Sequence, residues 1–109
     1  MATTELEALV RDDSGTSVIE LRGDIDGRAD AALDAAYTQV EQSDDVQLDF
    51  SGVTYMNSTG IALIVGLLAR ARKNGHTLSA AGLSHHYREI FEITRLADFM
   101  TIVDEEEAA

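Results

Sequence analysis

The stretch Leu48–Ile61 reads LDFSGVTYMNSTGI and organises the interpretation of the whole chain. Its first half has the alternating apolar pattern of a buried strand, and it continues through a short turn into a helix. At the junction stand Asn57, Ser58, Thr59 and Gly60. Because a helix N-terminus has unpaired N–H groups and a positive dipole, an anion can be held at such a junction. Ser58 could therefore be a helix cap, a nucleophile, a phosphate ligand or a residue that receives a phosphate.

On both sides of this stretch, the apolar periodicity predicts elements in the order β-β-α-β-α-β-α-β. Strands are expected over residues 5–11, 16–22, 46–50, 77–81 and 101–103. The first two strands form a hairpin through a turn at 12–15. Helices are expected over 29–40 with Asp26 as cap, from the junction to just before Gly75, and after a cap at Ser84. Because helices then alternate with strands, the crossovers should be parallel and right-handed.

The strands alternate apolar and polar residues, whereas parallel sheets covered on both faces usually have continuous apolar strands. We therefore expect helices mainly on one face of a mostly parallel sheet of about five strands, with the first strand antiparallel. A chain of 109 residues is long enough for one core, so residues 1–109 are expected to form a single α/β domain. The acidic run from about residue 104 is expected to be a solvated tail.

Composition excludes several classes of function. The formal net charge is −12, which argues against nucleic acid or an anionic membrane as the main partner. The chain has no cysteine, so disulfides and thiolate zinc sites are excluded. No apolar run is long enough to span a membrane and the N-terminus lacks the pattern of a signal peptide, which predicts a cytoplasmic protein without membrane insertion.

The residues that would carry catalysis or bind a metal are missing or badly spaced. His76 follows a turn and is expected to be exposed, while His85 and His86 are adjacent and point about 100° apart on a helix, so they cannot share a metal. Neither a Gly-x-Ser-x-Gly motif nor a dinucleotide or P-loop motif is present. We therefore predict no enzyme, no metal and no cofactor. Asp24 and Asp26 are the two carboxylates whose position suits a binding site. They lie close to a carboxyl-terminal strand edge, where α/β proteins bind ligands.

Three blocks in the right order resemble the STAS domain family, the anti-sigma factor antagonists. Leu48–Ile61 is similar to the family's D-[LF]-S-x-V strand followed by D-S-[ST]-G and an apolar helix. Residues 23–26, GDID, are similar to its motif after the second strand, and residues 88–96, REIFEITRL, to its C-terminal motif. The resemblance covers nearly the whole chain, and the family's fold agrees with the element order predicted above.

The resemblance implies a partner-switching regulator. In such proteins the serine that corresponds to Ser58 is phosphorylated by an ATP-binding serine protein kinase that is also the anti-sigma factor. The unphosphorylated form binds that kinase and frees the sigma factor, the phosphorylated form dissociates, and a phosphoserine phosphatase restores it. The implied partner-binding residues are Asp24, Asp26, Asn57, Ser58, Thr59 and Gly60. The expected oligomeric state is a monomer or weak dimer.

The chain departs from the family pattern at two positions. Asn57 stands where the family usually has aspartate, which leaves helix capping intact but removes a charge that could matter for phosphorylation. Arg95 replaces a common glycine and could reshape a turn. Three alternatives stay open: Ser58 as a plain helix cap, Asp24 as a turn-stabilising residue, and a STAS scaffold or transporter-accessory module that binds its partner constitutively.

Overall fold

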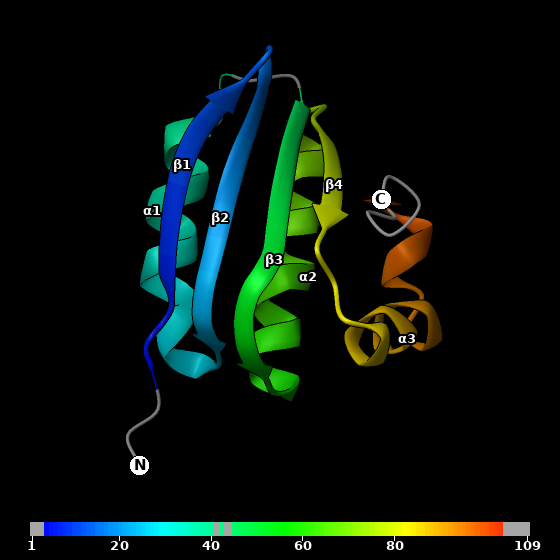
Figure 1. Cartoon of the computed structure of the whole chain (residues 1–109). Coiled ribbons are helices and arrows are strands. Elements are labelled where there is room, and N and C mark those ends of the chain that lie inside the picture. Colours follow the sequence, from blue (N-terminus) through cyan, green and yellow to red (C-terminus); the bar gives the residue numbers. More distant parts are fainter. Residues whose placement is uncertain (1–3, 41, 43–44, 104–109) are drawn as a thin grey trace.

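A computed structural model describes residues 4–40, 42 and 45–103, and its elements follow the predicted order β-β-α-β-α-β-α-β (Figure 1). The strands are β1 (Glu7–Asp13), β2 (Thr16–Ile25), β3 (Asp45–Met56), β4 (Thr77–Ala81) and β5 (Thr101–Ile102). The helices are α1 (Asp30–Val40), α2 (Ser58–Lys73) and α3 (His85–Ile93), with short 3-10 helices η1 (Gly27–Ala29) and η2 (Leu96–Asp98). The acidic tail predicted from about residue 104 lies outside the described residues.

The strands form one sheet in the order β1-β2-β3-β4-β5, with β1 antiparallel to β2 and the other neighbours parallel. Figure 1 shows α1 and α2 on one side of this sheet, with α3 beyond β4. The prediction of a mostly parallel sheet of about five strands, with the first strand antiparallel and helices mainly on one face, is therefore confirmed. Among the described residues, helices cover one sheet face and none lies on the other, which is called the open face below.

The hairpin between β1 and β2 closes more tightly than expected. Ser14 and Gly15 both have positive φ values, 56° and 92°, which is typical of a two-residue turn that matches strand twist. Asp13 consequently pairs with Thr16, so the predicted turn over 12–15 is wrong at its first two residues. At its other end β1 begins at Glu7, and Glu5 makes only an isolated bridge to Asp24.

Strands β2 and β3 both run further than their apolar alternation indicates. Their register shifts between Glu20 and Arg22 and again between Gly23 and Asp24, which breaks the strict alternation. Gly52 lies in this irregular region, where a Cβ would be only 2.9 Å from the Leu21 carbonyl oxygen. The paired strands continue past these bulges, so β3 reaches Met56. Only Asn57 separates it from α2, and the separate turn expected there is absent.

The core lies between the sheet and its helices. Phe50 of β3 and Phe91 of α3 are both buried and make an edge-to-face contact with ring centroids 5.7 Å apart. Tyr37 of α1 is fully buried, and its hydroxyl contacts His76 Nδ1 at 2.5 Å. The expectation that His76 is exposed was wrong: its ring is partly buried because it is a polar partner for the Tyr37 hydroxyl.

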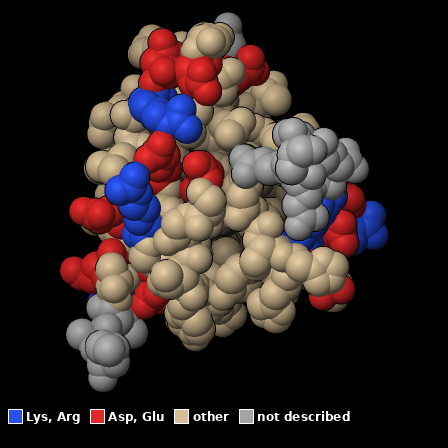
Figure 2. Space-filling model, in the orientation of Figure 1, with Lys and Arg blue, Asp and Glu red and all other residues tan. Residues whose placement is uncertain are grey.

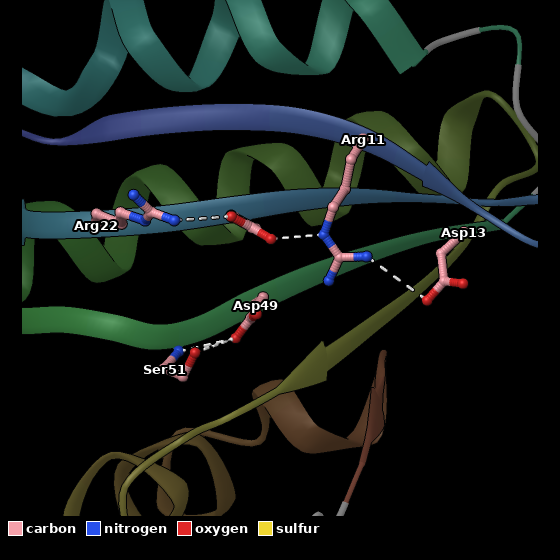
Figure 3. Close-up of polar contacts among 6 residues, drawn as sticks. Arg11, Asp13, Arg22, Asp49 and Ser51 are labelled. Carbon is pink, nitrogen blue, oxygen red and sulfur yellow. Dashed lines mark hydrogen bonds and ion pairs between the residues drawn. The ribbon is translucent and has the colours of Figure 1, made fainter.

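The open face of the sheet is polar. Figure 2 shows charged side chains gathered over β1 and β2, and fewer of them over the lower part of β3. Figure 3 shows Arg11 and Arg22 on adjacent strands. Both guanidinium groups bind the Glu20 carboxylate, with N–O distances of 2.5 and 3.2 Å. On β3, Asp49 accepts hydrogen bonds from the Ser51 N–H and hydroxyl. Such exposed pairs contribute little stability, but they account for the polar half of the strand alternation.

The N-terminus of α2 packs directly on the end of β2. Gly60 is buried there, and a Cβ at this position would lie 1.8 Å from the carbonyl oxygen of Ile25. Further along the same helix Gly66 is exposed, and a Cβ there would meet nothing within 4 Å. In the part of the chain that the structure describes, no helix is long and apolar enough to cross a membrane.

The two glycines of α2 make a matched prediction. We expect Gly60→Ala to lower the free energy of unfolding by about 3 kcal/mol or more, because the new methyl group collides with a backbone oxygen that cannot move away freely. Gly66→Ala should instead raise it by about 0.5–1 kcal/mol, since alanine favours the helix and has room. Urea denaturation followed by circular dichroism measures both, and equal effects would contradict the packing described here.

Candidate functional site

The candidate site is the edge of the sheet where β2 and β3 end side by side. The Asn57 N–H donates to the Ile25 carbonyl oxygen at 3.3 Å, which joins the end of β2 to the start of α2. A Cβ on Gly27 would lie 3.5 Å from the Thr59 methyl group, so η1 lies against the first turn of α2. The structure thus brings Asp26 to the same edge as Asn57–Gly60, although they are about 30 residues apart in sequence.

Asn57 is the cap of α2. Its side-chain Oδ1 accepts a hydrogen bond from the Gly60 N–H at 2.9 Å, and its carbonyl oxygen accepts from the Ile61 N–H at 2.9 Å. The backbone of Asn57 is extended, as expected of an N-cap residue. The interpretation of Ser58 as a plain helix cap is therefore wrong, because Ser58 is the first helical residue and Asn57 makes the capping bond.

The four junction residues differ in accessibility. Ser58 and Thr59 are exposed, Asn57 is half-buried and Gly60 is buried. The two hydroxyl-bearing residues therefore stand on the surface at the positive end of a helix of 16 residues. Gly60, predicted as a partner-binding residue, lies under this surface and permits the close packing of α2 on β2.

Asp24 lies inside the edge rather than on it. Its residue is only 6% exposed, and its Oδ1 accepts a hydrogen bond from the Thr54 hydroxyl at 2.7 Å. Its backbone N–H donates to the carbonyl oxygen of Thr4, so the N-terminal segment runs alongside it. This geometry favours a structural role for Asp24 over docking, because a partner would have little of the side chain to contact. The residue lies within β2 and binds Thr54 of β3, so it links two strands and does not stabilise a turn.

Asp26 is half-buried at this edge and is held by Arg28. The carboxylate of Asp26 accepts from the Arg28 backbone N–H at 3.0 Å, which caps η1, and from Arg28 Nη2 at 2.9 Å. The guanidinium of Arg28 and, after it, this backbone N–H hold the pKa of the Asp26 carboxyl below its ordinary value. The edge therefore carries a fixed carboxylate with a cation beside it.

Two contributors to the site were not singled out by the sequence analysis. The Tyr87 hydroxyl of α3 accepts a hydrogen bond from the Met56 N–H at 2.9 Å and so fixes the last residue of β3 before the junction. Thr54 fixes Asp24 as described above. The backbone partner of Tyr87 is 31 positions away, so no local sequence pattern indicates the bond.

Of the three histidines, His86 contacts the ring of Tyr87, and the other two make their contacts elsewhere. His76 contacts Tyr37, and His85 lies 3.6 Å from Glu89 on the same helix. Among residues 4–40, 42 and 45–103, no group of three or more histidine, aspartate or glutamate side chains could hold a metal ion. What the arrangement offers chemically is an accessible hydroxyl at a helix N-terminus, with a carboxylate and a guanidinium on the neighbouring loop.

The capping assignment is testable by alanine substitution. Asn57→Ala should lower the free energy of unfolding by about 1 kcal/mol, because the Gly60 N–H loses its partner. Ser58→Ala should change it by less than about 0.5 kcal/mol, since that side chain is exposed. Ser84→Ala, which removes the observed cap of α3, serves as the positive control in the same denaturation experiment. If Ser58→Ala lowers the free energy of unfolding more than Asn57→Ala does, Ser58 and not Asn57 is the cap of α2.

The ion pair at Asp26 predicts a pH dependence. Because the pKa of Asp26 is lowered in the folded protein, its charge contributes stability above its unfolded pKa, and this contribution is lost as the pH falls through the folded pKa. Asp26→Asn should therefore be less stable than the wild type from pH 7 down to about pH 5, and the difference should shrink below about pH 4. Denaturation curves across this range measure it. In a protein that also carries Arg28→Ala, Asp26→Asn should change the free energy of unfolding much less. An unchanged difference would show that the effect does not come from the Asp26–Arg28 ion pair.

Comparison with known proteins identifies the family. The family model described as "Mlab, STAS domain" matches residues 8–104. The anti-sigma-B factor antagonist of Staphylococcus aureus (strain NCTC 8325 / PS 47) is 31% identical over 86 residues, which are 77% of this chain and 80% of that protein.

Solved structures agree in fold. An anti-sigma factor antagonist from Mycobacterium paratuberculosis has a TM-score of 0.76 at 22% identity, covering 90% of this chain and 85% of that one. The anti-sigma factor antagonist SpoIIAA in its unphosphorylated form has a TM-score of 0.69 at 20% identity over 93% of each chain. The Bacillus cell fate determinant SpoIIAA in the phosphorylated form has a TM-score of 0.67 at 22% identity, over 93% of this chain and 95% of that one. The chain belongs to the STAS domain family, among the anti-sigma factor antagonists.

Proposed function

We propose that this protein is a partner-switching regulator that binds an anti-sigma factor through the edge around Ser58 and is released when Ser58 is phosphorylated. The anti-sigma factor is proposed to be the ATP-binding serine kinase that phosphorylates it, and a phosphoserine phosphatase resets the cycle in the cytoplasm. The observation that carries the proposal is that Ser58 is exposed at the start of α2 while Asn57 makes the capping bond. The hydroxyl is therefore available for modification without loss of a structural contact.

The local electrostatics support a switch that leaves the fold unchanged. A phosphate on Ser58 would add about −1.5 to −2 charges at the positive end of a helix, where an anion is tolerated. The same charge would stand on the surface that a partner covers. At a separation of about 6 Å, a group of charge −2 and one partner carboxylate repel by roughly 1.4 kcal/mol in water, and by more in a dry interface.

The proposed contact surface includes fewer residues than the six that the sequence predicts to bind the partner. Asp26, Asn57, Ser58 and Thr59 retain exposed or partly exposed side chains and are proposed to contact the partner directly. Asp24 and Gly60 are buried, and we assign them to holding the edge in shape. The relatives' name, anti-sigma-B factor antagonist, supports an anti-sigma factor as the class of partner.

A constitutive STAS scaffold or transporter-accessory module is the second candidate. The observation that favours it is the amide of Asn57, which caps α2 as well as a carboxylate would but lacks the charge that the family pattern places beside the serine. In this alternative the edge binds a partner permanently, and Ser58→Ala leaves both the affinity and the cellular phenotype unchanged.

The test is to incubate the protein with the anti-sigma factor kinase of its own organism and ATP, and to locate phosphate by mass spectrometry. We expect one phosphate on Ser58, its loss in Ser58→Ala, and no loss in Ser84→Ala, which removes another exposed serine at a helix start. The phosphorylated protein should bind the kinase on the order of 100-fold more weakly, which corresponds to about 3 kcal/mol. Tight binding without any phosphate on Ser58 would support the constitutive module instead.

A further inference from the structure

The outer face of α2 continues in line from Ser58. Val65, Ala69 and Arg72 follow Ser58 at separations that place them within about 40° of it around the helix axis. All four residues are exposed, and Val65 is 44% exposed. The outward face of a surface helix is usually polar. Val65 and Ala69 are apolar and lie on this face, so packing in the protein's own core does not account for them.

Beside this face lies an apolar groove between α2 and the segment formed by the end of α3 and η2. It has a volume of about 310 Å³, and its apolar lining includes Ile61, Val65, Leu68, Leu96 and Phe99. Phe99 is 51% exposed. Because Ile61 lies one helical turn from Ser58, the groove begins next to the proposed docking edge.

Two arginines stand at the rim of this groove in a protein of net charge −12. The Arg72 guanidinium lies over the ring of Phe99, 4.9 Å from its centroid. Arg95 has φ 68°, a left-handed conformation that glycine adopts at lower cost, and its guanidinium lies 2.8 Å from Asp98. Arg95 therefore brings a guanidinium to the rim of the groove with the Asp98 carboxylate beside it.

Charge selects among the possible occupants. The net charge of −12 opposes every acidic partner at long range, so the local charge at the rim decides. A second copy joined symmetrically through the groove would place arginine against arginine. A protein segment with an apolar side and flanking carboxylates fits both the lining and the rim.

Building on the proposed function, we propose that the anti-sigma factor bound at Ser58 also inserts an apolar segment flanked by acidic residues into the groove between α2 and η2. Ser58 and Val65 are separated by about 10 Å along α2, so one partner can cover both. The groove then supplies affinity at a distance from the phosphorylated residue, and the two contributions to binding should be approximately additive.

The test measures the affinity of the same anti-sigma factor kinase for four variants by calorimetry. Val65→Glu should weaken binding at least 10-fold, and Arg72→Glu should weaken it by a similar factor and reduce its dependence on salt. Leu9→Glu is the matched control for the first, because Leu9 is 45% exposed on β1, the antiparallel strand at the edge of the sheet. Arg22→Glu, on β2, is the control for the second. Both controls should bind within about 3-fold of the wild type, and circular dichroism checks that all four variants are folded.

The outcomes separate this inference from the proposed function. If the wild type binds and phosphorylation of Ser58 weakens binding, but Val65→Glu and Arg72→Glu bind like the wild type, the groove is not part of the interface and the inference is overturned while the switch stands. If the wild type does not bind the kinase at all, the proposed function fails and the inference with it. If sedimentation shows a dimer that Val65→Glu dissociates, the occupant is a second copy and the inference is again overturned.

Discussion

The close contact between the start of α2 and the end of β2 is the constraint on which the functional edge depends. Gly60 lies so near the Ile25 carbonyl that no side chain fits, and the Asn57 N–H bonds to that same carbonyl. Once Gly60 faces inward, the periodicity of the helix turns Ser58, two residues earlier, outward. The exposure of the proposed phosphorylation site is thus a geometric consequence of a buried glycine within the same helical turn.

Polar contacts from several elements hold this edge in one conformation before any partner arrives. Thr54 binds Asp24, Arg28 binds Asp26, and Tyr87 binds the backbone at Met56. The first and third contacts join segments about 30 residues apart, and the second lies within the loop that follows β2. An edge fixed in this way loses little conformational freedom on binding, which favours affinity from a small surface. It also explains how a charge added at Ser58 can change recognition while the sheet and helices stay as they are.

The faces of the molecule differ in chemistry as well as in structure. The open sheet face carries paired charges on β1 and β2, and α1 and α2 cover the opposite face (Figures 1 and 3). Two of the eight lysines and arginines, Arg72 and Arg95, line the apolar groove. A strongly acidic protein thereby keeps one region where an apolar, acidic segment would be attracted, and this region begins at the same helix terminus as Ser58.

Element order, fold class and the importance of the 57–60 junction could be read directly from the chain, because strand and helix periodicities and cap residues are local signals. The same signals predicted β4 and the cap at Ser84 correctly. They could not assign the cap of α2 between Asn57 and Ser58, nor show that Asp24 is buried. Those outcomes depend on contacts such as Thr54 with Asp24 and Met56 with Tyr87, 30 and 31 residues apart. Strand register, bulges and the packing of α3 bring such pairs together, and these exist only once the whole sheet has formed.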